Sequence, residues 1–291
     1  MKKIIAVSIV LFSSISLFAQ DDLMKELEAS QKPETTYIGQ TFKGTRIING
    51  QSVETKSKGA LEFIFSHRFG RINSGAYTLW GLDDAFVRLG FEYGLTDRLG
   101  IGIGRSSTDK TFDSFLRYKV ARQSTGVRNF PVTITAMGTA NIKTSPNDNP
   151  LLTYDDRLSY VAQVMFARKF STNFSVQVTP MFIHRNTVVK SKENNDDFAI
   201  GVGGRYKITR SLALSGEYYY RLKPHENTPY YNSIGVGLDI ETGGHVFQLL
   251  FTNSLSMIER AVVVETDGDF GAGDIHFGFN ISRTFQIQKP K

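Results

Sequence analysis

The sequence lacks cysteine entirely, and it contains a single tryptophan in 291 residues. The absence of cysteine excludes disulfide bonds, thiol nucleophiles and cysteine-ligated metal sites in one step. It also excludes a lipoprotein anchor, because no cysteine is present to carry the lipid. Any chemistry of this chain must therefore depend on its other side chains.

Long apolar runs are also missing beyond the N-terminus. Lys2 and Lys3 precede an apolar stretch interrupted by serines, residues 4–18, and an imperfect small-residue cleavage signal lies at residues 17–19. This pattern is typical of a secretory signal peptide. The alternative, a transmembrane anchor, needs about 20 apolar residues, and this run is shorter. We therefore expect a cleavable signal peptide over residues 1–20.

A concentrated charge of one sign is absent as well. The net charge is +6, and Lys2 and Lys3 supply two of these positive charges. The remaining charges are spread along the chain, with no basic block and no basic helical stripe. The sequence therefore gives no support for nucleic-acid binding.

What the sequence does contain is apolar alternation with a period of two. The clearest example lies within residues 83–123, where Leu99, Ile101 and Ile103 alternate with glycines. This period is typical of β-strands, because successive side chains point to opposite faces. A hydrophobic fraction of 41% is low for a helical membrane protein, whereas 12 tyrosines and 22 phenylalanines suit strands and interfacial girdles.

The alternation predicts about twelve strands, an even number, as bacterial single-chain membrane barrels require. The links between them alternate between short turns, such as residues 96–98 and 209–211, and longer polar loops, such as residues 144–155 and 256–273. Only residues 108–110 break this pattern. Short turns on one side and long loops on the other are typical of an outer-membrane barrel, with both termini on the periplasmic, short-turn side. The predicted strands are residues 60–69, 83–95, 99–107, 111–123, 130–143, 156–170, 174–188, 197–208, 212–223, 231–240, 245–255 and 274–287.

The face opposite the apolar one carries many charged residues. A soluble β-sandwich would have to bury these charges in a dry core, which is prohibitively unfavourable, whereas the wet lumen of a barrel accommodates them. With Arg68 included, seven bases face four acids, which favours anions weakly. The candidate lumen-lining residues are Glu62, Arg88, Glu92, Asp113, Arg117, Lys119, Lys169, Arg205, Glu217 and Arg221.

Residues 21–59 do not follow the strand pattern. Residues 22–30 can form a short helix, which Pro33 ends, and residues 36–49 read as extended chain. Two interpretations remain open for this region: a periplasmic tail leading to the barrel, or a plug inside the lumen, since plugs recur in membrane barrels.

Two patterns in the sequence resemble sites of chemistry. His67 and His184 are expected to face lipid, as a barrel lipid hydrolase would require, but no strand serine pairs with either. Residues 265–274 place carboxylates at Glu265, Asp267 and Asp269, but this spacing lacks the full ligand set of an EF-hand. We therefore predict a solvated acidic loop, no metal or other cofactor, and no enzymatic activity.

Several short motifs resemble a known family. They are His67-Arg68-Phe69-Gly70, residues 93–99 (YGLTDRL), Gly104-Arg105-Ser106-Ser107, Tyr118-Lys119 and Arg122-Gln123-Ser124. In these motifs the chain resembles the outer-membrane β-barrel family catalogued as domain of unknown function 5777, from about Thr41 to the C-terminus. The resemblance implies a barrel in a Gram-negative outer membrane, and it implies no particular activity.

The sequence thus predicts an all-β protein with a single antiparallel up-and-down transmembrane barrel over residues 60–291. The expected function is that of a narrow passive channel for small polar or anionic solutes. The alternative is a closed barrel that serves as a structural or partner-docking platform, and a lipid hydrolase is the least supported interpretation. The expected partners are outer-membrane lipid and the barrel-assembly machinery, and the expected state is a monomer.

Overall fold

The computed structural model describes residues 34–146 and 152–288. The predicted signal peptide over residues 1–20 and the predicted helix over residues 22–30 lie outside these ranges.

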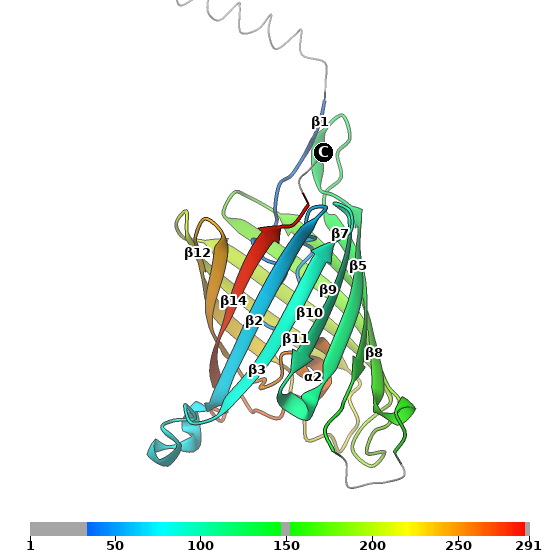
Figure 1. Cartoon of the computed structure of the whole chain (residues 1–291), viewed down its shortest axis with the longest axis vertical. Coiled ribbons are helices and arrows are strands. Elements are labelled where there is room, and N and C mark those ends of the chain that lie inside the picture. The colour runs from blue at the N-terminus through cyan, green and yellow to red at the C-terminus, as the bar shows by residue number, and fades with distance from the viewer. Residues whose placement is uncertain (1–33, 147–151, 289–291) are drawn as a thin grey trace, which may run out of the picture.

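Twelve antiparallel strands close into a single barrel (Figure 1), which confirms the predicted all-β, up-and-down architecture. Each strand pairs with its neighbours in chain order, and β14 pairs with β2 to close the wall. The strands are β2 (Ala60–Arg71), β3 (Ala85–Gly94), β4 (Leu99–Ser106), β5 (Phe112–Ala121), β7 (Thr133–Ile142), β8 (Leu158–Lys169), β9 (Phe174–Arg185), β10 (Asp196–Lys207), β11 (Leu212–Leu222), β12 (Ile234–Glu241), β13 (His245–Thr252) and β14 (His276–Gln286).

The predicted strands correspond one to one with the observed ones, and the differences lie at their ends. The strand predicted over residues 130–143 begins at Thr133 instead, after Pro131, which has no N–H to donate to a ladder. The strand predicted over residues 174–188 ends at Arg185, whose N–H donates to the Asn195 carbonyl as the chain leaves the wall.

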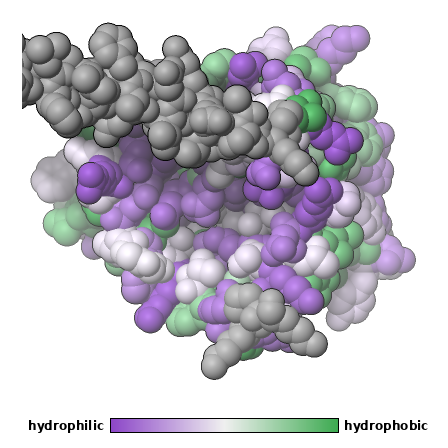
Figure 2. Space-filling model, turned by 90° about the horizontal axis from the view of Figure 1, so that it is seen from above, coloured by the Kyte–Doolittle hydropathy of each residue, from purple (hydrophilic) through white to green (hydrophobic). Residues whose placement is uncertain are grey.

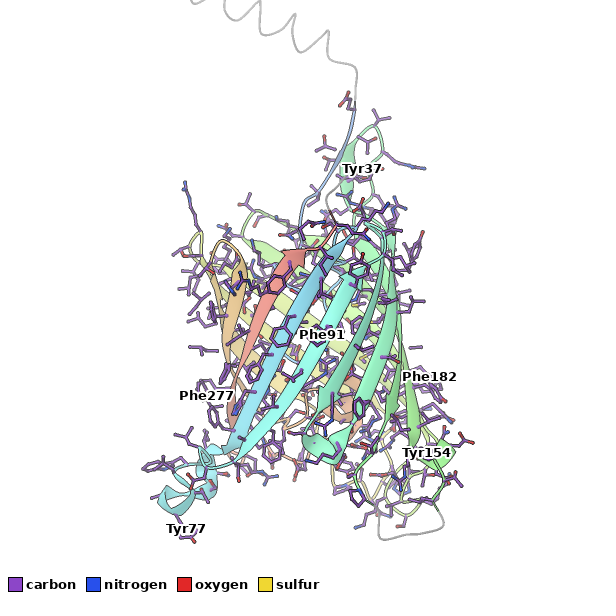
Figure 3. All side chains as sticks on the ribbon, in the orientation of Figure 1. Tyr37, Tyr77, Phe91, Tyr154, Phe182 and Phe277 are labelled. Carbon is purple, nitrogen blue, oxygen red and sulfur yellow. The ribbon has the colours of Figure 1, made fainter. Side chains whose placement is uncertain are left out.

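The wall has an apolar outer face and a polar inner face. On β3, Leu89 and Phe91 are 43% and 42% exposed, whereas Arg88 and Glu92 are each 1% exposed. Aromatic rings pack against one another along the outside (Figure 3), as in the pair Phe182 and Phe198 with centroids 5.1 Å apart. An apolar outer face of this extent requires lipid around it. The closed ladder makes a lipid environment possible, because it leaves no strand edge with unpaired backbone groups.

The remaining elements of the described residues are short. A two-stranded sheet of β1 (Thr35–Tyr37) and β6 (Ser124–Gly126) stands beyond the short-turn end of the barrel. Four 3₁₀ turns lie at the loops: η1 (Ile72–Ser74), η2 (Ala76–Thr78), η3 (Thr108–Lys110) and η4 (Asp155–Arg157). Among the described residues, no helix has the length and apolar character to cross a bilayer.

The connection between β13 and β14 differs from the expected polar loop. It contains a six-residue helix, α2 (Glu259–Val264), all of whose residues are buried. This helix contacts β8 and β11 from the inner side of the barrel. Val262, Val263 and Val264 explain the burial, since three adjacent valines in a loop would otherwise face water.

Candidate functional site

Residues 40–57, here called the lumenal segment, lie inside the barrel. Phe42, Ile48 and Val53 are 2%, 0% and 0% exposed, although none of them belongs to a wall strand. The segment doubles back on itself: the Ile47 N–H donates to the Gly50 carbonyl at 2.9 Å, and Arg46 and Gln51 form an antiparallel bridge. A hairpin therefore reaches into the lumen from the short-turn end.

Glu217 of β11 holds the tip of this hairpin. Its carboxylate accepts the backbone N–H groups of Asn49, Gly50 and Ile48 at 2.8, 3.0 and 3.2 Å. Successive N–H groups at a turn form a concave donor set that suits an anion. Glu217 therefore supplies the acceptors that the buried turn would otherwise lack.

Arg117 of β5 holds the returning strand of the hairpin. Its Nη1 donates to the Glu54 carbonyl at 2.6 Å, and its Nη2 donates to the Gln51 side chain. Its Nε lies 3.3 Å from Oε1 of Glu92, which belongs to β3, two strands away in the wall. Because Arg117 is fully buried, its charge is committed to these partners.

Wall amides and hydroxyls satisfy much of the remaining hairpin backbone. Gln177 accepts from the Val53 N–H at 2.9 Å and donates to the Gln51 carbonyl at 2.8 Å. Other wall donors are Thr135 to the Val53 carbonyl at 2.8 Å, Gln248 to the Ile47 carbonyl at 2.6 Å, and Asn280 to the Ile48 carbonyl at 3.0 Å. Contacts therefore come from strands around the whole barrel, namely β5, β7, β9, β11, β13 and β14.

Inward-facing glycines make room for the hairpin. A Cβ at Gly203 would lie 2.6 Å from Ile47 Cδ1, and Cβ atoms at Gly235 and Gly237 would lie 2.9 and 2.7 Å from Ile48 methyl groups. These distances are shorter than van der Waals contact allows. The wall is thus shaped to the two isoleucines.

The helix α2 meets the lumenal segment from the loop side. Arg46 Nη1 lies 2.9 Å from Glu259 Oε1, and Gln51 Nε2 donates to the same oxygen at 2.5 Å. Gln51 and Glu259 are buried, and the side chain of Arg46 is 10% exposed. Two segments entering from opposite ends therefore touch at Glu259, deep in the barrel.

The ten residues predicted to line the lumen lie on the inner side of the wall, and the structure gives most of them a partner of opposite charge. Glu62, Arg88, Glu92, Asp113, Arg117, Glu217 and Arg221 are buried, and Lys119, Lys169 and Arg205 are partly exposed. The ion pairs are Arg88–Asp113 at 2.5 Å, Arg117–Glu92 at 3.3 Å, Lys56–Glu62 at 2.7 Å, Lys119–Glu54 at 3.4 Å, Arg205–Asp239 at 3.2 Å and Arg221–Asp197 at 3.2 Å. Lys169 donates to the Gln40 carbonyl at 3.0 Å, and Glu217 binds the hairpin as described above.

Sequence reasoning missed several charged groups in the lumen. Asp197 and Asp239 share the inner faces of their strands with Arg205 and Glu241, so the alternation could have identified them. Arg46, Glu54, Glu259, Arg260 and Glu265 belong to the two inserted segments, for which no strand period exists. With these acids included, bases no longer clearly outnumber acids in the lumen.

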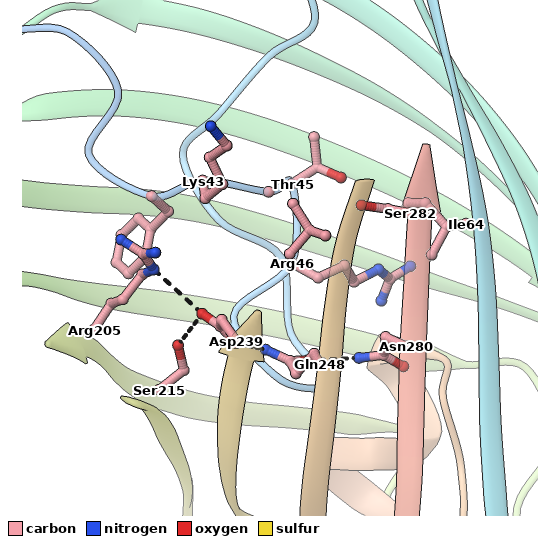
Figure 4. A pocket seen from close by; sticks show the side chains of 13 residues that line it. Lys43, Thr45, Arg46, Ile64, Arg205, Ser215, Asp239, Gln248, Asn280 and Ser282 are labelled. Atoms are coloured by element: carbon pink, nitrogen blue, oxygen red, sulfur yellow. Dashed lines mark hydrogen bonds and ion pairs between the residues drawn. The ribbon is translucent and has the colours of Figure 1, made fainter. Parts of the chain in front are cut away.

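Two cavities mark the space that remains around the lumenal segment. A cavity of about 720 Å³ opens at the short-turn mouth, where residues such as Lys56, Glu62 and Lys119 line it. Figure 2 shows hydrophilic residues around this hollow end. A second cavity of about 30 Å³, the size of one water molecule, lies deeper beside Arg46, Arg205 and Asp239 (Figure 4).

His67 and His184, the two candidate catalytic histidines, contact an aromatic ring and a carboxylate and not a serine. His67 stacks on Phe279 with ring centroids 5.0 Å apart, and His184 Nδ1 lies 2.6 Å from Asp196 Oδ1. Among the described residues, no serine hydroxyl forms a hydrogen bond with either ring. A serine–histidine pair is therefore not assembled at these positions.

The carboxylates of residues 265–274 belong to two different ion-pair groups. Glu265 pairs with Arg260 and Lys143, whereas Asp267 and Asp274 lie 3.1 and 3.2 Å from Arg71. The expectation of a solvated acidic loop is therefore wrong for Glu265, which lies partly buried in an ion-pair cluster directly after α2. Within residues 34–146 and 152–288, no group of three acidic or histidine side chains is placed to hold a metal ion.

A closed antiparallel wall with an apolar exterior and a polar interior defines the class of membrane β-barrels. The chain belongs to the family described as "Membrane bound beta barrel domain (DUF5777)", whose model matches residues 42–285. The match begins within the lumenal segment, so the family domain includes most of that segment as well as the wall.

Several solved barrels are similar in fold. A KdgM porin has 10% sequence identity and a TM-score of 0.46, covering 78% of this chain and 99% of the porin. The COG4313 outer membrane channel from Pseudomonas putida F1 has 14% identity and a TM-score of 0.47, covering 80% and 98% of the two chains. Salmonella typhi OmpF, in complex with daunomycin, has 9% identity and a TM-score of 0.40, covering 78% and 97%. No curated protein matched the sequence.

Proposed function

We propose that this protein is an outer-membrane barrel that acts as a gated passive channel for small polar solutes, with the lumenal segment as its plug. The observation that carries the proposal is the way in which residues 40–57 are held. They occupy the lumen through hydrogen bonds and ion pairs to wall side chains such as Glu217, Arg117 and Gln177. Polar contacts can be exchanged for hydrogen bonds to water, and each contributes only about 0.5–1.5 kcal/mol net between neutral groups and about 1.5–3 kcal/mol to a charged group.

The wall itself supports a removable plug. Its inner face is polar, and at Gly203, Gly235 and Gly237 it lacks the side chains that would fill the lumen permanently. A barrel of about twelve strands has an interior wider than that of the smallest barrels and narrower than that of 16–18-stranded porins. Withdrawal of the hairpin would leave a hydrated passage lined by the charged residues described above.

The charge at the short-turn mouth bears on the solute. Five bases and three acids line the 720 Å³ cavity: Lys43, Lys56, Arg98, Lys119 and Arg122 against Glu54, Glu62 and Asp97. This excess attracts anions into the mouth. We therefore propose a weak preference for anionic solutes, set at the mouth and not along the nearly balanced lumen.

The setting proposed for this channel is the Gram-negative outer membrane. The short-turn end carries the N-terminal segment and the C-terminal strand end together, as periplasmic export followed by insertion through barrel-assembly machinery requires. We propose a monomer without enzymatic activity, since neither His67 nor His184 contacts a nucleophile.

A second candidate function is a closed platform for partner proteins. It is favoured by one observation: α2 also enters the lumen and contacts the hairpin through Glu259. A lumen closed from both ends suits a barrel that never conducts.

A reversible cross-link separates the two functions. Ile48 Cβ lies 3.4 Å from the position that a Cβ would take at Gly235, close to the roughly 3.5–4.5 Å that a disulfide requires. Since the chain has no cysteine, the Ile48→Cys/Gly235→Cys variant can form only this one disulfide within a molecule. In a planar bilayer, we expect conductance steps under reducing conditions, silence after oxidation, and recovery with reductant.

The two single-cysteine variants, treated with the same oxidant, are the controls and should conduct throughout. Equal conductance of the oxidised and reduced double variant would contradict the plug. Silence of the folded, reduced protein would instead favour the platform.

A further inference from the structure

The loop between β2 and β3 is unlike the other long loops of the barrel. Residues 72–82, here called the aromatic wing, contain no charged residue, and Asp83 and Asp84 follow them at the base of the loop. The loop between β9 and β10, in contrast, carries Lys190, Lys192 and Glu193. The wing nevertheless lies outside the barrel wall, at the end of the barrel that carries the long loops (Figure 1). The uncharged residues 72–82 of this extramembrane loop therefore require a particular environment.

The wing exposes large apolar side chains. Tyr77 is 98% exposed, and Leu79, Trp80 and Leu82 are 51%, 56% and 45% exposed. Trp80 is the only tryptophan of the sequence. Figure 3 shows Tyr77 at the outer extremity of the loop, away from the wall. Exposed apolar side chains concentrated in one loop indicate an interaction surface.

This exposure is built into a folded turn. The Trp80 N–H donates to the Gly75 carbonyl at 2.8 Å, and the Gly70 N–H donates to the Gly81 carbonyl at 2.8 Å. Leu79 and Trp80 both adopt left-handed backbone conformations, with φ of 49° and 54°. Bulky residues rarely adopt that conformation, so hydrogen bonds within the wing hold it and fix where the side chains project.

The base of the wing is tied to the rim of the barrel. Arg71 lies 3.1 Å from Asp267 and 3.2 Å from Asp274, and Asn73 Nδ2 donates to Asp274 Oδ1 at 2.7 Å. The wing is therefore fixed in position relative to the wall.

Next to the wing, the wall carries a dense aromatic cluster that faces lipid. Phe69 and Phe277 stack with centroids 5.6 Å apart, Phe251 and Phe277 lie 5.3 Å apart, and His67 lies 4.3 Å from Phe69. Phe69 is only three residues before the wing begins. The charged residues between the apolar surface of the wall and the wing are Arg71 on the β2 side and Asp83 and Asp84 on the β3 side, at the base of the loop.

We propose that the aromatic wing is a lipid-interface anchor, whose tyrosine, tryptophan and leucine side chains insert among the headgroups of the membrane beside β2 and β3. Tryptophan and tyrosine favour this layer because their rings are apolar and their N–H and O–H groups are polar. Continuity with the lipid-facing cluster and the absence of charge within residues 72–82 favour lipid over a soluble partner, which would leave the apolar surface in water until it bound.

The single tryptophan allows a direct test, because all indole emission of the full chain comes from Trp80. The protein is refolded into phosphatidylcholine vesicles with bromine either near the headgroup or at the chain ends. We expect Trp80 to emit at shorter wavelength than an indole in water and to be protected from acrylamide. We also expect it to lose most of its intensity to bromines near the headgroup and little to those at the chain ends.

Two relocated tryptophans calibrate the depth. In Trp80→Phe/Tyr154→Trp, the indole replaces a 78% exposed side chain in a polar loop and should be quenched by acrylamide alone. In Trp80→Phe/Phe91→Trp, it replaces a residue of the lipid-facing wall and should be quenched by bromines deeper in the bilayer.

Emission of Trp80 that matches the Tyr154→Trp control would overturn the proposal and leave the wing as a surface for an extramembrane partner. A blue shift that disappears as the protein-to-lipid ratio is lowered would also overturn it, because the occupant would then be a second copy of the chain. Neither outcome depends on whether the barrel conducts.

Discussion

At the scale of single residues, Glu217 and Arg117 decide how firmly the lumen is closed. Each binds two or more groups of the lumenal segment while belonging to a wall strand. Removing one partner of a buried polar contact costs more than the contact contributes, because the other partner remains buried and unsatisfied. These two side chains are therefore expected to have large effects on gating and small effects on the wall.

Glu217→Gln is expected to loosen the hairpin. The amide keeps the shape of the side chain but offers one acceptor oxygen and no charge to three backbone N–H groups. Loss of charge-assisted hydrogen bonds costs about 1.5–3 kcal/mol, which corresponds to roughly a tenfold or greater rise in the open fraction. Single-channel recording measures that fraction, and Glu226→Gln, an exposed loop substitution, is the matched control. An unchanged open fraction would show that Glu217 does not hold the segment.

Glu265 gives the loop side its pH dependence. Burial opposes its ionisation, but Arg260, Lys143 and Arg185 outweigh burial and lower its pKa from 4.5 to about 2. A carboxyl with a lowered pKa stabilises the folded state above its unfolded pKa, and this stabilisation is lost as the pH falls from about 4.5 through about 2. The shift corresponds to roughly 3 kcal/mol.

Glu265→Gln should therefore lower the free energy of unfolding at pH 7 and leave little difference from the unsubstituted protein near pH 2. Denaturant unfolding in detergent across this pH range measures the effect. A constant difference at every pH would assign the loss to packing and not to charge.

At the scale of elements, the strands of the wall can be predicted from the sequence, whereas the two inserted segments largely cannot. The strands follow from period-two alternation, and the inward position of residues such as Arg88 and Asp113 follows from the same period. That these side chains line a conducting passage stays a prediction. The helix α2 was missed because six residues are too few to establish a helical period. The sequence predicts extended chain over residues 36–49 and does not predict the hairpin. Only Asn49 and Gly50, which are turn-forming residue types, indicate that the chain reverses there.

The glycines of the wall illustrate the same limit. Alternation shows that Gly203 and Gly235 face inward, but it does not show that Ile47 and Ile48 occupy the space they leave. Partners separated by more than 150 positions in the sequence leave no local pattern.

Adjacent glycines of β10 offer a matched test of this fit. Gly203→Val places a branched side chain where Ile47 now lies, 2.6 Å from the Cβ position, whereas the nearest atom to a Cβ at Gly204 is 3.6 Å away. Overpacking costs typically about 1–3 kcal/mol, so Gly203→Val should displace the hairpin and increase cleavage at residues 40–57 by an added protease. Gly204→Val should leave the cleavage rate unchanged. Equal cleavage of both variants would contradict the proposed fit.

At the scale of the whole molecule, three features share one wall: an apolar exterior, a polar interior, and two segments that enter from opposite ends and meet at Glu259. The apolar exterior requires a lipid environment, and the proposed role of the aromatic wing extends the contact with lipid beyond the rim of the barrel. The interior determines function, because the same charged groups either close the lumen against the hairpin or line a passage once it leaves. The account therefore depends on one property, the removability of the lumenal segment.

The most direct measurement is single-channel conductance of the folded chain with and without residues 34–58, recorded in the same bilayer. The account predicts rare, brief steps from the full chain and sustained steps of uniform size from the shortened one. Folding of both proteins is checked by the β-sheet circular dichroism of the refolded barrels. Sustained conductance from the full chain, or silence from both folded proteins, would contradict the assignment of residues 40–57 as the gate.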